Sequence, residues 1–164
     1  MNSSFANLNS NSRVWVFQSD RFLTENEANH IRKYMDAFMP EWASHGNDLY
    51  GGYSVEKNLF LVVGVDESKI PASGCSIDSL TRVVKELGKT LSIDFFNRMA
   101  IAYENKAGEI IIVSLPDFKR LIIESKINEN TIVFNNLITT KKDFDTNWQT
   151  PVKNSWHTNL FQIV

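Results

Sequence analysis

The most apolar stretch of the chain, Leu59–Val65, limits what the chain can fold into. It is far shorter than the ~20 apolar residues that a helix needs to cross a bilayer. Its β-branched and aromatic residues favour a strand instead. The polar segment Glu56–Asn58 before it predicts a hairpin that joins two strands, Leu49–Val55 and Leu59–Asp66. We therefore expect a sheet at the centre of the protein.

Two helices are expected beside these strands. Thr24 and Glu27 have the spacing of a capping box, in which a side chain and a backbone group bond each other at the start of a helix. That helix should end near Met39, because Pro40 disfavours helical geometry in the residue before it. Apolar residues recur at helical intervals over Ser76–Leu87 and predict the second helix.

The order of elements up to Glu104 is β-α-β-β-α-β, which is the ferredoxin-like order. The further elements expected are strands at Val14–Gln18, Met99–Glu104, Glu109–Leu115 and Thr131–Phe134, and helices at Pro116–Ile123, after Thr140 and from Pro151. We predict an α+β fold with a mainly antiparallel sheet, helices on one face and a C-terminal extension.

Length and composition suggest a single domain over residues 13–164, preceded by a disordered tail, because residues 1–12 are rich in Asn and Ser. The start of the sequence lacks the basic and apolar segments of a signal peptide, which favours a cytoplasmic protein. Net charge is -2 with interspersed signs, so neither nucleic acid nor a membrane is an expected partner. The single cysteine, Cys75, excludes an internal disulfide. No cofactor is expected.

The tripeptide Gly88–Thr90 mimics the end of a phosphate-binding loop. Such a loop needs an earlier glycine where this chain has Val83, and it must precede a helix, not follow one. The alternative is that Gly88 ends the second helix, with Lys89 near its last carbonyl groups. We therefore predict that the chain is not a P-loop ATPase.

A cluster of small residues before the second helix is the best candidate site. Its candidate ligand-binding residues are Ser73, Gly74, Cys75, Ser76 and Asp78, because backbone N–H groups at a helix start can hold an anion. Cys75 there is a candidate nucleophile, with His45 as candidate base. Equally, Ser73 or Ser76 is an ordinary helix cap and Cys75 a small buried apolar residue.

Other polar residues give weaker signals. The three histidines, His30, His45 and His157, lack metal-ligand spacing, so no metal site is predicted. Asp48 is an acid/base candidate in the same loop as His45. The pair Asp66–Glu67 either ligates a cation or faces water.

The C-terminal segment is rich in aromatic residues, including Trp148 and Trp156. A helix from Pro151 would place Val152, Trp156 and Leu160 on one face, which predicts that Trp156 anchors the core. The alternative is an exposed patch through which two copies of the chain form a homo-oligomer.

Several segments together resemble a small family of proteins from Bacteroidetes-type bacteria that are often labelled ABC transporter ATPases. The segments are Arg13–Val16, Trp42 with Ser44–Gly46, Asp66–Glu67 with Ala72–Asp78, Asn128–Thr140, and Trp148 with Pro151 and Ser155–His157. That label implies a P-loop, which this sequence lacks, and the resemblance carries no catalytic residues over.

Two functional hypotheses follow. The first is a non-enzymatic domain that binds a protein partner or a small anionic ligand. The alternative is an enzyme with a nucleophilic site centred on Cys75 at the start of the second helix.

Overall fold

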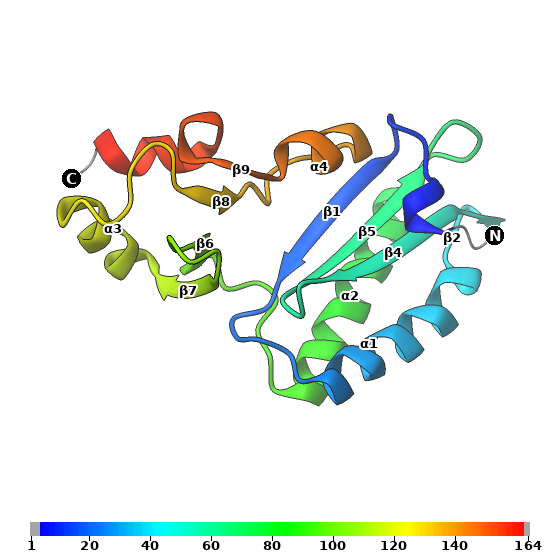
Figure 1. Ribbon diagram of the computed structural model, residues 1–164. Coiled ribbons are helices and arrows are strands. Elements are labelled where there is room, and N and C mark those ends of the chain that lie inside the picture. The colour runs from blue at the N-terminus through cyan, green and yellow to red at the C-terminus, as the bar shows by residue number, and fades with distance from the viewer. Residues whose placement is uncertain (1–3, 163–164) are drawn as a thin grey trace.

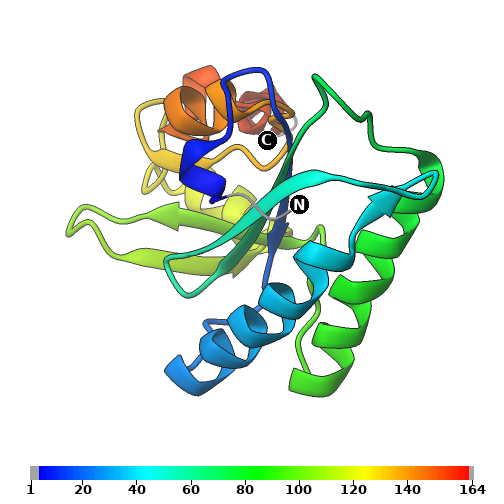
Figure 2. The same cartoon turned by 90° about the vertical axis from the view of Figure 1, so that its right-hand side faces the viewer.

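The computed structural model describes residues 4–162, and its first half is a three-stranded antiparallel sheet covered by two helices. The sheet order is β1-β5-β4, and α1 and α2 lie side by side on one of its faces (Figures 1 and 2). The elements are β1 (Arg13–Gln18), α1 (Glu25–Phe38), β2 (Ala43–Ser44), β3 (Asn47–Asp48), β4 (Tyr50–Glu56), β5 (Phe60–Asp66) and α2 (Gly74–Leu91). The predicted α+β class is confirmed.

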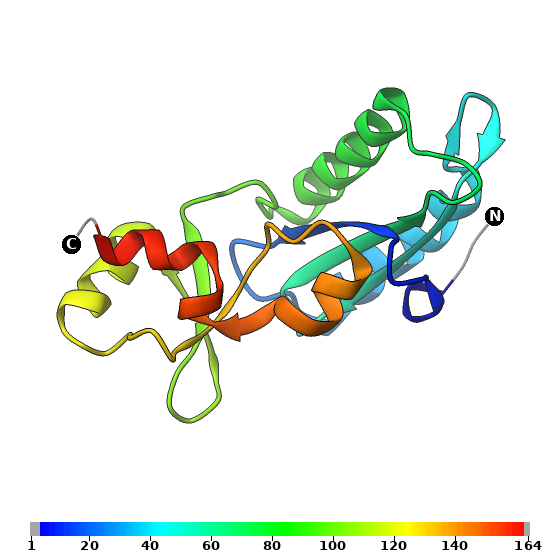
Figure 3. The same ribbon diagram turned by 90° about the horizontal axis from the view of Figure 1, so that it is seen from above.

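The second half is a separate four-stranded sheet with order β7-β6-β8-β9. Its elements are β6 (Ala100–Glu104), β7 (Ile110–Ser114), α3 (Leu115–Ile123), β8 (Ile132–Phe134), α4 (Lys141–Asn147) and β9 (Gln149–Pro151). Short 3-10 helices occur at η1 (Phe5–Asn7), η2 (Met39–Glu41), η3 (Val152–Asn154) and η4 (Trp156–Gln162). In Figures 1 and 3, α3 and η4 lie at the opposite end of the molecule from β2.

The strand after α2 does not complete a ferredoxin-like sheet. β6 pairs with β7 and β8, not with the edge of β1 that faces away from β5. That edge is already occupied, because the Val14 N–H donates to the Thr139 carbonyl at 2.9 Å and Arg13 bridges to Thr140. A segment more than a hundred residues away in sequence thus takes the position that the predicted order assigns to β6.

β5 is the central strand of the first sheet and is buried on both faces. Leu61, Val63 and Val65 pack against the helices, whereas Phe60 and Val62 pack against the second half. The predicted hairpin before it is present. Lys57 and Asn58 both have positive φ. Positive φ at both central residues is required in the kind of hairpin turn whose twist matches that of the adjoining strands.

The capping box that starts α1 is confirmed. The Glu27 N–H donates to Thr24 Oγ1 at 3.1 Å, and the Thr24 N–H donates to Glu27 Oε1 at 2.9 Å. Arg21 also binds Glu27 at 2.7 Å, and this bond lowers the pKa of Glu27 to about 2. The same guanidinium donates to the Leu91 carbonyl at 2.8 Å, so it ties the start of α1 to the end of α2.

The prediction that Gly88 ends the second helix is wrong, since α2 continues to Leu91. Ser92 has a left-handed conformation, and the Ile93 N–H turns back to donate to the Gly88 carbonyl at 2.8 Å. A Cβ on Gly88 would lie 2.5 Å from the Ile93 carbonyl oxygen. Gly88 is therefore the contact point for the returning chain, which leads directly into the second sheet.

The predicted disordered tail is wrong for residues 4–12; residues 1–3 lie outside the described part. Phe5 and Leu8 are buried, and the Phe5 ring meets Phe144 edge-on at 5.3 Å. Gly64 of β5 makes room, because a Cβ there would lie 2.7 Å from Leu8 Cδ1. Two apolar side chains are enough to fix a segment that is otherwise rich in Asn and Ser.

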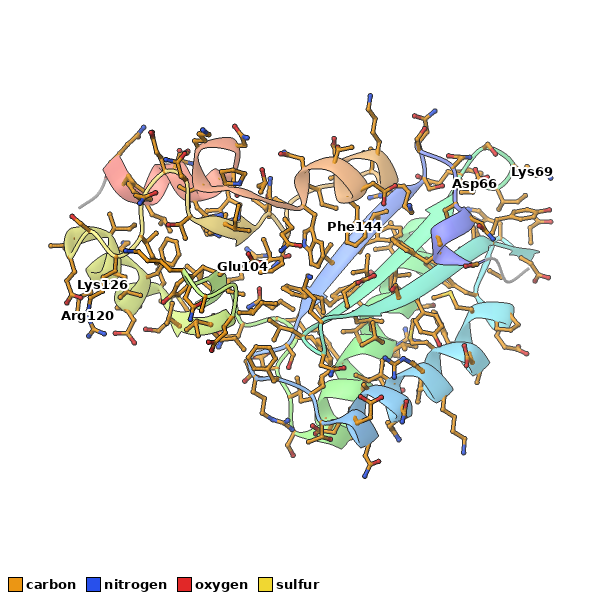
Figure 4. All side chains as sticks on the ribbon, in the orientation of Figure 1. Asp66, Lys69, Glu104, Arg120, Lys126 and Phe144 are labelled. Atoms are coloured by element: carbon orange, nitrogen blue, oxygen red, sulfur yellow. The ribbon has the colours of Figure 1, made fainter. Side chains whose placement is uncertain are left out.

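The two sheets share a core. Its buried residues include Val14 and Phe60 from the first sheet and Ala102 and Phe134 from the second. Trp148 lies among the rings of this core, with centroids 4.7–5.1 Å from its neighbours Phe144, Phe60 and Phe134. Figure 4 shows Phe144 of α4 over β1 and β5. The aromatic residue Trp148 is thus core, not surface.

The single helix predicted from Pro151 is not formed; the segment instead contains two 3-10 helices, η3 and η4, which the extended residue Ser155 separates. Pro151 ends β9, and the Val152 N–H donates to the Thr131 carbonyl at 2.9 Å beside β8. The chain therefore stays paired with β8 through Pro151, and η3 begins at Val152. Val152 and Leu160 are buried as expected, but Trp156 is only half-buried. The prediction of Trp156 as a fully buried anchor is therefore corrected.

Candidate functional site

The serines at the start of α2 form its cap. The Ser76 N–H donates to Ser73 Oγ at 3.2 Å, and the Ser73 N–H donates to Ser76 Oγ at 2.7 Å. Ser76 is buried, and its carbonyl accepts the Trp42 indole N–H at 2.8 Å. Gly74 and Asp78 are exposed. The capping interpretation of this segment is confirmed, and both serine hydroxyls are used in it.

Cys75 is exposed on the first turn of α2, so the alternative that it is a small buried apolar residue is wrong. His45 lies at the turn of the β2–β3 hairpin with a φ of 52°. Within residues 4–162, no side-chain hydrogen bond joins the Cys75 thiol to His45, Asp48 or another acid or base. In that part of the chain, the candidate nucleophile and the candidate base are thus not joined by a hydrogen bond.

No group of three His, Cys, Asp or Glu side chains in residues 4–162 is arranged to hold a metal ion. Asp66 and Glu67 shape their own loop. Hydrogen bonds from the Ser68 side chain and from its N–H, the latter at 2.9 Å, lower the pKa of Asp66. Glu67 accepts the Ala72 N–H at 2.9 Å. In Figure 4, Asp66 and Lys69 are at the end of the molecule remote from α3. In the same described range, no helix has the length and apolarity needed to span a bilayer.

A cleft of about 650 Å³ opens between the two sheets. Small-molecule sites in proteins have volumes of roughly 300–1,000 Å³. The cleft is bordered by β1, by the segment that follows α2, by β6, by the loop after β8 and by η4. Most of its wall is apolar and aromatic, and the large side chains are Phe17, Phe95, Phe96, Phe134, Leu137 and Trp156.

One side of the cleft is a chain of hydrogen bonds between the two halves of the protein. The Trp148 indole N–H donates to Asn136 Oδ1 at 2.9 Å, and Asn136 Nδ2 donates to Gln18 Oε1 at 3.0 Å. Gln18 Nε2 then donates to the Ala100 carbonyl at 3.1 Å. Because each amide is held at both ends, Gln18 and Asn136 are structural members of the wall.

Arg98 is the charged residue of the cleft. It is exposed and lines the cleft, and it makes no hydrogen bond, ion pair or ring contact with any residue in the described part of the chain. By contrast, Arg21 and Arg120 each pair with a carboxylate. The Arg98 guanidinium therefore keeps its full set of donors for a bound molecule.

His157 lines the cleft but is only 2% exposed. Its Nδ1 lies 2.6 Å from Ser155 Oγ, the Trp156 ring stacks on it at 4.0 Å, and Phe118 lies 5.8 Å away. Burial lowers the pKa of His157 to about 4. The imidazole is therefore neutral at pH 7.

The sequence does not predict this cleft. Its polar residues are spread over the whole chain and form no motif; they are Gln18, Asn97, Arg98, Asn136 and His157. The only local signal was the aromatic segment that contains His157. Comparisons of the chain with protein-family models, with curated proteins and with solved structures find no match, so the family resemblance stays a prediction and the cleft is the strongest guide to function.

Proposed function

We propose that the chain is a binding module that takes a small organic anion with an apolar body into the cleft between the two sheets. The observation that carries the proposal is the lining itself, which combines aromatic walls with one unpaired arginine, Arg98. Of the two hypotheses from the sequence, the proposal follows the first, a non-enzymatic domain, and takes the ligand to be a small anion instead of a protein partner.

The charge of the lining favours an anion over a cation. Among the described lining residues, Arg98 and His157 are the only ionisable groups, and His157 is neutral at pH 7. No carboxylate is present there to attract a cation. A guanidinium binds a carboxylate or phosphate through two parallel hydrogen bonds, which fixes the orientation of the ligand as well as its charge.

The lining also favours binding over catalysis. Its described residues include no thiol, hydroxyl, carboxylate or amine that could act as a nucleophile. Cys75 is at the start of α2, whereas the lining residues Phe95–Arg98 follow the end of that helix. Eighteen helical residues extend about 27 Å, so the thiol and the cleft are at opposite ends of α2.

The proposal is tested with a matched pair of probes, phenylbutyrate and its uncharged amide. Backbone NMR signals of the cleft should shift saturably with phenylbutyrate and much less with the amide. Arg98→Gln should weaken phenylbutyrate binding by about tenfold or more, the value of hydrogen bonds to a charged group. Arg82→Gln is the control, because Arg82 is an exposed arginine of α2 that does not line the cleft.

The proposal fails if aromatic and aliphatic carboxylates and phosphates leave the cleft signals unmoved. It also fails if Arg82→Gln weakens binding as much as Arg98→Gln does, since the effect would then reflect overall charge alone.

A further inference from the structure

One polar atom of the cleft has no partner. Nδ1 of His157 is bonded to Ser155, whereas Nε2 makes no hydrogen bond within the described residues. In that same range, no side-chain nitrogen or oxygen that is sealed from solvent lacks a partner. Nε2 must therefore keep some accessible surface although its residue is 2% exposed. Since His157 lines the cleft, we infer that this surface of Nε2 faces the cleft.

The Ser155 contact determines which nitrogen carries the proton. A neutral imidazole has one N–H donor and one acceptor nitrogen. If Nδ1 were the donor, both the buried Ser155 hydroxyl proton and the Nε2 lone pair would be left without partners. If instead the Ser155 hydroxyl donates to Nδ1, its proton is used and Nε2–H remains as the only free donor. The second arrangement leaves fewer unpaired groups and is the more stable.

The ring cannot turn away from the cleft. Trp156 stacks on it at 4.0 Å with the ring planes 25° apart, and Phe118 packs against it at 5.8 Å. A side chain that is fixed by packing and by one hydrogen bond presents its other donor in a constant direction. Nε2–H is thus an organised donor and not a mobile one.

We propose that His157 is a second ligand-binding residue of the cleft, whose Nε2–H donates to a neutral carbonyl oxygen, with Ser155 as the positioning residue. This inference rests on the proposed function and specifies its ligand class. The ligand is an oxo acid or acyl derivative with three parts, namely a carboxylate or phosphate for Arg98, an apolar body for the aromatic wall and a carbonyl for His157.

Arg98 and His157 differ in burial, and this difference explains why the ligand group that binds His157 is a neutral carbonyl. Arg98 is exposed, so an anion bound to it keeps part of its hydration. His157 is almost fully buried and carries no charge at pH 7. Moving a full charge into that environment would be costly, whereas a carbonyl needs only one donor to replace its lost water.

The test compares benzoylpropionate with phenylbutyrate, which lacks the ketone but has the same carboxylate and ring. In protein labelled with [¹⁵N]histidine, the free protein should show His157 as the Nε2–H tautomer. Benzoylpropionate should shift the Nε2 signal and bind about three- to tenfold more tightly than phenylbutyrate, the gain expected for one neutral hydrogen bond. Ser155→Ala should mix the tautomers and remove this preference while phenylbutyrate binding still depends on Arg98.

Three results would overturn the inference. One is an Nδ1–H tautomer in the unmodified protein, and another is an unmoved Nε2 signal while the backbone signals of Gln18 and Arg98 shift with benzoylpropionate. Both would leave the proposed function intact. The third is that neither probe moves any cleft signal, which would remove the proposed function and the role of His157 together. The tautomer and the probe comparison are measured on the unmodified chain, so they decide the matter even if Ser155→Ala fails to fold.

Discussion

Replacing Gly88 by alanine should destabilise the protein, although alanine is the better helix former. In a helix interior, Gly to Ala gains up to about 1 kcal/mol. Here a Cβ would lie 2.5 Å from the Ile93 carbonyl oxygen, and this oxygen belongs to backbone that is held by the 2.8 Å bond from the Ile93 N–H to Gly88. Forcing that backbone away costs about 1–3 kcal/mol and also weakens the bond. We expect a net loss of about 1–2 kcal/mol in the free energy of unfolding.

Gly74→Ala is the matched control in the same helix. Gly74 is the first residue of α2, and a Cβ there would meet nothing within 4 Å. This variant should gain up to about 1 kcal/mol, because alanine restricts the unfolded chain. Thermal unfolding separates the two, since 1 kcal/mol corresponds to about 2–4 °C in a domain of this size. A Gly88→Ala protein as stable as the wild type would refute the role given to the Ile93 turn.

Three further predictions test other features. Because burial lowers the pKa of His157 to about 4 from about 6.5 in the unfolded chain, only the unfolded state gains a proton between these values. Stability should fall by up to about 3 kcal/mol as pH drops from 6.5 to 4, and guanidinium titrations of His157→Gln should show a flatter profile. Phe5→Ala should cost about 3 kcal/mol, and unchanged stability would show that the N-terminal segment does not pack. Cys75→Ser should change the free energy of unfolding by no more than about 0.5 kcal/mol and should leave phenylbutyrate binding unchanged. Loss of phenylbutyrate binding would instead place the thiol in the binding site.

Local chemistry was predictable from the sequence wherever a few adjacent residues decide the outcome. Thr24 and Glu27 form the expected capping box, and the turn at Lys57 and Asn58 joins the expected strands. The bounds of α3, Leu115–Ile123, differ from the prediction by one residue, because Pro116 fits only the first turn of a helix.

The errors arose where distant segments meet. β6 was assigned to the first sheet because nothing near it shows that Thr139 already occupies the edge of β1. Gly88 was predicted to end α2, since its contact with the Ile93 carbonyl is a property of the folded chain. The cleft was missed for the same reason. Arg98 and His157 are 59 residues apart and belong to no common motif.

The hydrogen-bond chain through Asn136 and Gln18 has a fixed direction, because every donor in it points from Trp148 toward Ala100. It contains dipoles only, so neither added salt nor a change of pH in the neutral range removes a link in it. An aspartate at position 136 would have no N–H to give Gln18, although it has almost the same shape as asparagine. Deamidation of Asn136, which replaces its amide NH2 by an oxygen, would therefore remove the hydrogen bond to Gln18 in the wall of the cleft.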